Sequence, residues 1–170
     1  IQSIEEPSLG FNIDKEVVPG RAFPVLVNFR NTKTLWFRLL KPDYDKDANL
    51  RQEYYGERGF EKYLAMQPVK EWSVTLPETF DFQQHSVEVI LPAVEPGYYA
   101  LLISGNESFN MGSSPLAAKD FWSSNISYIS RRDRNGSGLF YLLDRSTGKP
   151  LEGIKVMSFT REYDYRTRTY

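Results

Sequence analysis

The chain has 170 residues, enough for one large domain or for one domain and part of a second. Its hydrophobic fraction of 41% can form a core, and no apolar run approaches the ~18 residues of a transmembrane helix. The 21 basic and 22 acidic side chains are nearly balanced, which argues against a nucleic acid or an anionic membrane as partner. Cysteine is absent, which excludes disulfides, thiolate metal sites and a cysteine nucleophile.

Short runs rich in Val, Ile, Phe and Tyr alternate with Pro, Gly and Asn, whereas helical periodicity is scarce. The sequence therefore predicts an all-β fold, an Ig-like antiparallel β-sandwich followed by part of a second one. The chain begins at Ile1 without an initiator methionine, and Tyr170 lies in a strand-like segment. We interpret the sequence as part of a longer protein.

Apolar residues alternate over residues 23–29 and 35–39, with a turn at 31–33 between them. This pattern predicts a β-hairpin. Further strands are expected at 72–76, 85–91 and 98–104. The inward positions of these strands predict a shared core, which contains Val25, Val27, Phe37, Val89, Leu101 and Ile103.

Between residues 42 and 68 the β pattern stops, and the spacing of Phe60, Tyr63 and Leu64 predicts a short helix in an insertion. The insertion also gathers aromatic side chains that a partner could contact. We favour a flap that packs these rings on its own sandwich over a protein contact or a carbohydrate platform. The candidate residues are Tyr44, Tyr54, Tyr55, Phe60 and Tyr63.

The segment 96–99, Pro-Gly-Tyr-Tyr, looks like the entrance to a Greek-key strand. The alternation turns Tyr99 inward, so we expect its hydroxyl to be buried and hydrogen-bonded, and that of Tyr98 to matter little. A polar segment at 110–115 predicts a boundary near Ala118. This gives one sandwich domain at 1–118 and an incomplete second sandwich at 119–170, with strands at 126–130, 139–143 and 154–159.

No catalytic, cofactor or metal residue is predicted, and we expect no enzymatic activity. His85 is the single histidine, and no serine-elbow motif accompanies it, so we read it as a strand residue. Aspartates at 43–47 imitate a calcium loop, but Ala48 and Tyr54 stand where such a loop needs glycine and glutamate. The arginine-rich segment 131–134 is expected to be a solvated turn.

Residues 139–156 read LFYLLDRSTGKPLEGIKV and resemble a strand-turn-strand element of bacterial alpha-2-macroglobulin-like proteins. In this element Gly148 permits a left-handed turn, Pro150 fixes its exit and Gly153 lets the next strand start close by. Upstream, the segments 29–38, 96–99 and 124–129 look, in this order, like a macroglobulin (MG) domain running into the next one.

The resemblance implies non-catalytic structural modules of a bacterial alpha-2-macroglobulin-like envelope protein, part of a protease-trapping inhibitor in the periplasm or cell envelope. The implied partners are neighbouring MG-like domains of the same chain and, through the parent protein, proteases. The thioester that many family members carry is not within these residues, because it needs a cysteine. The alternative is an Ig-like binding module of an envelope protein that recognises carbohydrate or a protein partner.

Overall fold

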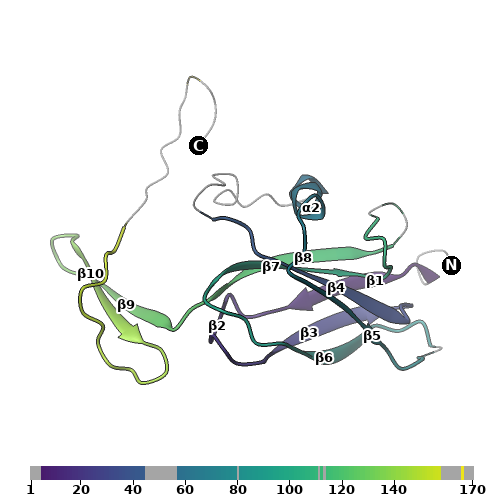
Figure 1. The fold of residues 1–170 in the computed structure, drawn as a ribbon, viewed down its shortest axis with the longest axis horizontal. Coiled ribbons are helices and arrows are strands. Elements are labelled where there is room, and N and C mark those ends of the chain that lie inside the picture. Colours follow the sequence, from purple (N-terminus) through teal and green to yellow (C-terminus); the bar gives the residue numbers. More distant parts are fainter. Residues whose placement is uncertain are drawn as a thin grey trace. The chain divides into compact units, whose positions relative to one another are not determined.

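The computed structural model describes residues 5–44, 57–79, 81–110, 112, 114–157 and 166, with only the backbone described for 57–60. These residues form mainly β-strands and one short helix, α2 (Figure 1), so the predicted all-β sandwich with a short helical insertion is confirmed. The strands and helix are β1 (Ser8–Asn12), β2 (Glu16–Val17), β3 (Phe23–Arg30), β4 (Thr34–Leu40), α2 (Glu57–Leu64), β5 (Lys70–Thr75), β6 (His85–Leu91), β7 (Gly97–Ser104), β8 (Leu116–Ser123), β9 (Ile126–Arg132) and β10 (Gly138–Asp144).

The chain divides into two compact units, unit 1 at Ile1–Asn125 and unit 2 at Ile126–Tyr170. Among the described residues, unit 1 holds a three-stranded sheet of order β1-β3-β6 and a five-stranded sheet of order β2-β8-β7-β4-β5. All pairs are antiparallel except β2 with β8, which is parallel. Unit 2 contains the antiparallel hairpin β9–β10.

The two sheets of unit 1 enclose a core to which alternate residues of every long strand contribute. All six core residues predicted from the sequence are buried there. Aromatic rings close one end, where Phe121 of β8 lies 5.4 Å from Phe23 and 5.6 Å from Tyr99 between ring centroids. At another point Phe37 stacks on Trp72 at 5.0 Å.

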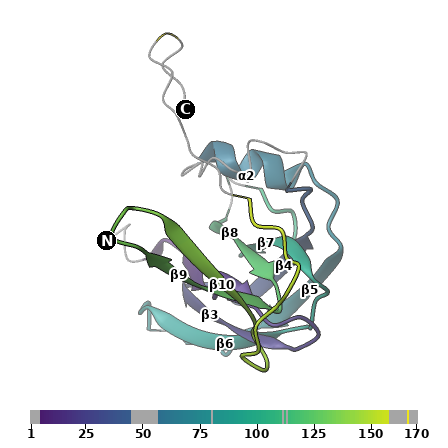
Figure 2. The ribbon, with the colours of Figure 1, turned by 90° about the vertical axis from the view of Figure 1, so that its left-hand side faces the viewer.

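Strand β7 is buried on both faces. Leu101 and Ile103 point into the core, while Ala100 and Leu102 belong to a second apolar cluster on the opposite face of the five-stranded sheet. Helix α2 lies over that outer face (Figures 1 and 2). Unit 1 is therefore built of three layers: the three-stranded sheet, the five-stranded sheet and the helical insertion.

The hairpin predicted from residues 23–39 is wrong. Both strands exist, but β3 pairs with β1 and β6, whereas β4 pairs with β5 and β7 in the other sheet. The turn at Asn31, whose φ is 53°, carries the chain across the core. Alternation gives each strand an inward face, and here the two inward faces meet across the sandwich rather than side by side.

The predicted boundary at Ala118 is also displaced. Ala118 lies in the middle of β8, which pairs with β7 along its whole length, and the two units divide after Asn125. The sequence concealed this strand because small and charged residues, among them Lys119 and Asp120, break its apolar alternation.

Of the strand predicted at 154–159, residues 154–157 are irregular and 158–159 lie outside the described residues.

We predict that a fragment ending at Asn125 unfolds cooperatively, whereas one ending at Ala118 does not, because the shorter piece loses Phe121 from the core. Within the longer fragment, Phe121→Ala should lower the free energy of unfolding by about 3 to 5 kcal/mol. Urea denaturation followed by circular dichroism measures both. Equal cooperative transitions for the two fragments would contradict the assignment of β8 to unit 1.

Candidate functional site: the aromatic insertion

Three aromatic rings gather where the insertion leaves the five-stranded sheet. Tyr98 of β7 and Trp122 of β8 are direct cross-strand partners, so both side chains stand on the outer face. Tyr44, which follows β4, closes the group, and its ring centroid lies 4.9 Å from that of Tyr98 and 4.8 Å from that of Trp122. The rings are tilted or edge-on, the arrangement that aromatic quadrupoles favour.

A hydroxyl network ties this cluster to the helix. The Tyr98 hydroxyl is hydrogen-bonded to the carboxylate of Asp120 and to Tyr63 of α2. Burial of the ring, reinforced by the bond to Asp120, raises the pKa of Tyr98 far above the usual tyrosine value. Tyr98 is therefore a neutral hydrogen-bond donor at any physiological pH, suited to holding α2 against the sheet rather than to acid–base chemistry.

The rest of the contact is apolar. Leu40, Ala100, Leu102 and Phe109 are buried beneath the insertion, and partly buried side chains pack on them. These packed side chains are Trp36, Tyr63, Leu64, Met66, Leu116 and Ala118. The guanidinium of Arg38 covers Phe109 at 4.1 Å from the ring centroid, and it also pairs with Glu71 at 2.6 Å. This second core fixes the insertion to the sheet.

The described members of the predicted aromatic set support the packed flap. Tyr44 and Tyr63 both contact the sheet, as that interpretation requires. Tyr54 and Tyr55 lie outside the described residues, and of Phe60 only the backbone, in α2, is described. The sequence did not single out Trp122, which at 38% is the most exposed of these three rings. The signal was present, because the inward position of its neighbour Phe121 places Trp122 outward.

The assignment of the buried hydroxyl to Tyr99 is wrong. Its ring does point inward, stacked on Phe121 among core side chains, and the Lys41 ammonium lies 5.4 Å from its ring centroid. Within the described residues no hydrogen bond of the Tyr99 hydroxyl is found, whereas the outward Tyr98 meets Asp120 and Tyr63. The two tyrosines therefore have the reverse of the roles expected from the sequence.

His85 lies at the start of β6, as a strand residue. Its Nε2 is 2.8 Å from Oδ1 of Asp81, and its ring faces Phe29 on the paired strand at 5.8 Å. This bond and the backbone N–H of Gln83 hold the pKa of Asp81 below its usual range. Within the described part of the chain, no serine hydroxyl bonds to His85, so the pair lacks a nucleophile.

Of the three aspartates in the acidic segment 43–47, only Asp43 is described, and those at 45 and 47 lie outside the described residues. Within the described ranges no group of three acidic, histidine or cysteine side chains is placed to hold a metal. The arginine-rich segment 131–134 runs from β9 into an exposed turn closed by a bond from the N–H of Asp133 to the carbonyl of Ser137.

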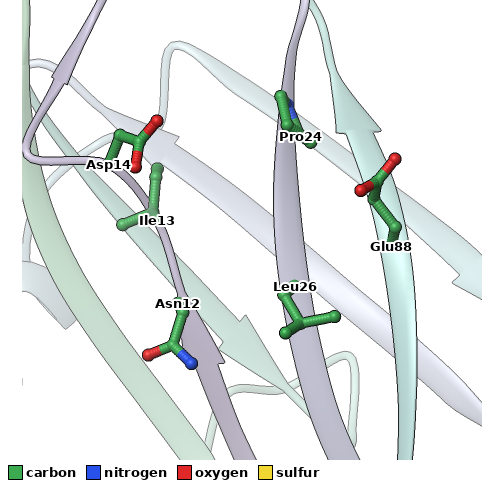
Figure 3. Close-up of a pocket in the computed structure, with 6 residues that line it drawn as sticks. All are labelled: Asn12, Ile13, Asp14, Pro24, Leu26 and Glu88. Carbon is green, nitrogen blue, oxygen red and sulfur yellow. The ribbon is translucent and has the colours of Figure 1, made fainter.

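One hollow lies on the opposite side of unit 1, on the outer face of the three-stranded sheet (Figure 3). Its volume is about 230 Å³, and it is shallow. Apolar side chains form its floor, and two carboxylates stand on either side of them. The lining residues are Asn12, Ile13, Asp14, Pro24, Leu26 and Glu88. A space of this kind suits a side chain of another protein segment better than an enclosed small molecule.

No protein-family model matches the sequence, and no curated protein is significantly similar to it. In the part of the chain that the structure describes, no helix has the length and apolarity needed to cross a membrane.

We predict that Tyr98→Phe lowers the free energy of unfolding by about 1 to 2 kcal/mol, because it removes a buried hydroxyl bonded to a carboxylate. The matched control Tyr99→Phe should change it by less than about 0.5 kcal/mol. Chemical denaturation of both variants supplies the comparison. Equal losses at the two positions would show that the hydroxyl network does not hold the helix.

Proposed function

We propose that the chain is a non-enzymatic structural segment of a bacterial alpha-2-macroglobulin-like envelope protein, with unit 1 as an MG-like sandwich and unit 2 as the opening of the next module. The observation that carries this proposal is the junction between them. Strand β8 ends at Ser123 and β9 begins at Ile126, so two residues separate a closed sandwich from a new β element. The N–H of Ser124 is bonded to the carbonyl of Val17, which anchors the junction to β2.

The turn that follows β10 supports the modular interpretation. The N–H of Gly148 donates to the carbonyl of Asp144 at 2.7 Å, and Gly148 has a φ of 70°, which a larger residue would adopt only with strain. The Thr147 hydroxyl donates to the Asp144 carboxylate at 2.8 Å. Pro150 then forms a β-bridge with Leu143, so the chain returns alongside β10. This is the start of a meander.

The hairpin also carries more apolar surface than two strands can bury. Tyr128 and Phe140 share one face, and their exposed fractions are 61% and 50%. Ile129 and Tyr141 share the other face, with exposed fractions of 58% and 53%. An isolated hairpin is marginally stable, so these side chains need further strands of the same module to cover at least one face.

In a protease trap of this family the role of such a segment is architectural. Unit 1 fits that role because several of its polar and aromatic side chains make packing contacts: Tyr98 holds α2, and Arg38 covers Phe109. The packing of Tyr44 and α2 on the sheet favours this function over the alternative, a carbohydrate-binding module, which needs an open aromatic platform. The inhibitory action on proteases belongs to the parent protein in this proposal.

Amide hydrogen exchange tests the modular part. At concentrations where the chain is monomeric, we expect the β9–β10 amides to exchange fast in the present chain and to become protected when the chain is extended through the next module of the parent, while β3 and β7 stay protected in both. Gly148→Val should weaken the gained protection, because it strains the turn. Unchanged exchange of the hairpin in the extended protein would contradict the proposal.

The trapping part is tested on the parent protein. After incubation with an endopeptidase, we expect hydrolysis of a large protein substrate to fall while hydrolysis of a small peptide substrate persists, because a trapped protease keeps a working active site. Equal inhibition of both substrates would indicate an active-site inhibitor instead. Saturable oligosaccharide binding by the present chain, abolished by Trp122→Ala, would favour the binding-module alternative.

A further inference from the structure

The β9–β10 hairpin is apolar on both faces, so packing on a single core covers only one of them. In an antiparallel sheet of a β-sandwich, one face usually packs on the core and the other is polar and solvated. Here Tyr128 and Phe140 occupy one face, with ring centroids 6.2 Å apart, while Ile129 and Tyr141 occupy the other. If the rest of the module covers one face, as the proposed function requires, the other still needs a cover from elsewhere.

The charge of unit 2 indicates what kind of surface that cover has. Unit 2 contains nine basic and five acidic side chains, a net charge of +4, and Arg131 and Arg132 sit at the end of the hairpin beside its apolar rows. Two hairpins facing each other would bring these arginines together, which is unfavourable. The complementary surface is therefore apolar at its centre and acidic at its rim.

Unit 1 carries such a surface on the outer face of the three-stranded sheet, which we call the acceptor face. Leu26 and Glu88 are direct cross-strand partners, and the neighbouring pair is Pro24 with Ile90. Leu26 is 43% exposed and Ile90 is 59% exposed, so an apolar patch spans both strands. Figure 3 shows Asp14 and Glu88 on opposite sides of Pro24 and Leu26.

The balance of charge over the whole unit agrees with this assignment. Unit 1 contains 12 basic and 17 acidic side chains, a net charge of −5. The hollow of about 230 Å³ at the acceptor face offers space for one large side chain between the two carboxylates. An aromatic or branched residue of the hairpin would fill it while a neighbouring guanidinium meets Asp14 or Glu88.

We propose that the β9–β10 hairpin of one copy of this chain docks on the acceptor face of a second copy. The contact joins two different surfaces, so it is heterologous, and each copy offers one hairpin and one acceptor face. Apolar burial supplies most of the affinity, and the arginine–carboxylate pairs set the orientation. This inference rests on the proposed function only in assigning the other face of the hairpin to its own module.

Sedimentation velocity of the intact chain tests the contact. We expect reversible, concentration-dependent association that weakens as salt is raised. Glu88→Lys, which alters the acceptor face, and the double variant R131E/R132E, which alters the hairpin, should each weaken self-association at least about tenfold. Glu107→Lys makes the same charge change in the exposed turn after β7 and should associate as the unchanged chain does.

Mixing the two impaired variants gives the decisive result. The Glu88→Lys chain keeps a native hairpin, and the R131E/R132E chain keeps a native acceptor face, so together they can form one intact contact. We expect the mixture to associate where neither variant does so alone, and this outcome also shows that both variants are folded. The two altered surfaces carry exchanged charges, so the complex can also grow beyond two chains, and the result is judged by association of the mixture rather than by a fixed stoichiometry.

Three outcomes would overturn the proposal. Undiminished self-association of Glu88→Lys would mean that hairpins pair with each other. A strictly monomeric unchanged chain would mean that no second copy covers the hairpin. Failure of the mixture to form a complex would mean that the two surfaces are not partners. None of these results bears on the exchange protection expected in the longer protein, so the two proposals fail separately.

Discussion

Strand β7 is apolar on both faces, and the layers of unit 1 follow from the need to cover it. A strand with one polar face can lie at the surface of a sandwich, but Ala100 and Leu102 are as fully buried as Leu101 and Ile103. The three-stranded sheet covers the inner pair. Helix α2 covers the outer pair, so the insertion is a third layer of the domain rather than an appendage.

Helix α2 needs both apolar contact area and a specific polar contact to hold one position on the sheet. Apolar packing of Leu64 and Met66 supplies area, but area alone does not fix the position of a short helix. The hydroxyl of Tyr98 fixes the position of the helix, because it links β7 to Asp120 of β8 and to Tyr63 of α2 in one hydrogen-bond network. Breaking this network would leave the hydroxyl of the buried Tyr98 without its partners, so the network favours one register of helix on sheet over its neighbours.

Alternation in the sequence predicted most strands of unit 1 and the residues of the core, because a period of two is a local property of the chain. It could not predict which strands pair. Residues 23–39 have the pattern of a hairpin, yet the same pattern serves two strands that face each other across a core. Strand β8 was hidden for a different reason: its pairing with β7 tolerates Lys119 and Asp120, whose side chains are exposed, so tertiary context outweighs composition.

The candidate site was predicted in part. The period of two correctly turned Tyr99 inward, and the break in that period located the aromatic insertion, but neither pattern says anything about the chemistry of the environment each ring enters. An inward hydroxyl needs an acceptor, and the core at Phe121 offers none, whereas the outward Tyr98 reaches a carboxylate. The partner of a polar group is a long-range fact, which a local pattern does not contain.

The β9–β10 hairpin resembles β7 in being apolar on both faces. In both places, side chains on two faces are too apolar for solvent, and in unit 1 the second cover comes from the chain's own helix. Unit 2 has no comparable insertion within residues 126–157, while its basic side chains select an acidic surface. Because unit 1 carries that surface and the opposite net charge, association of copies in a head-to-tail sense satisfies both the apolar and the electrostatic requirement.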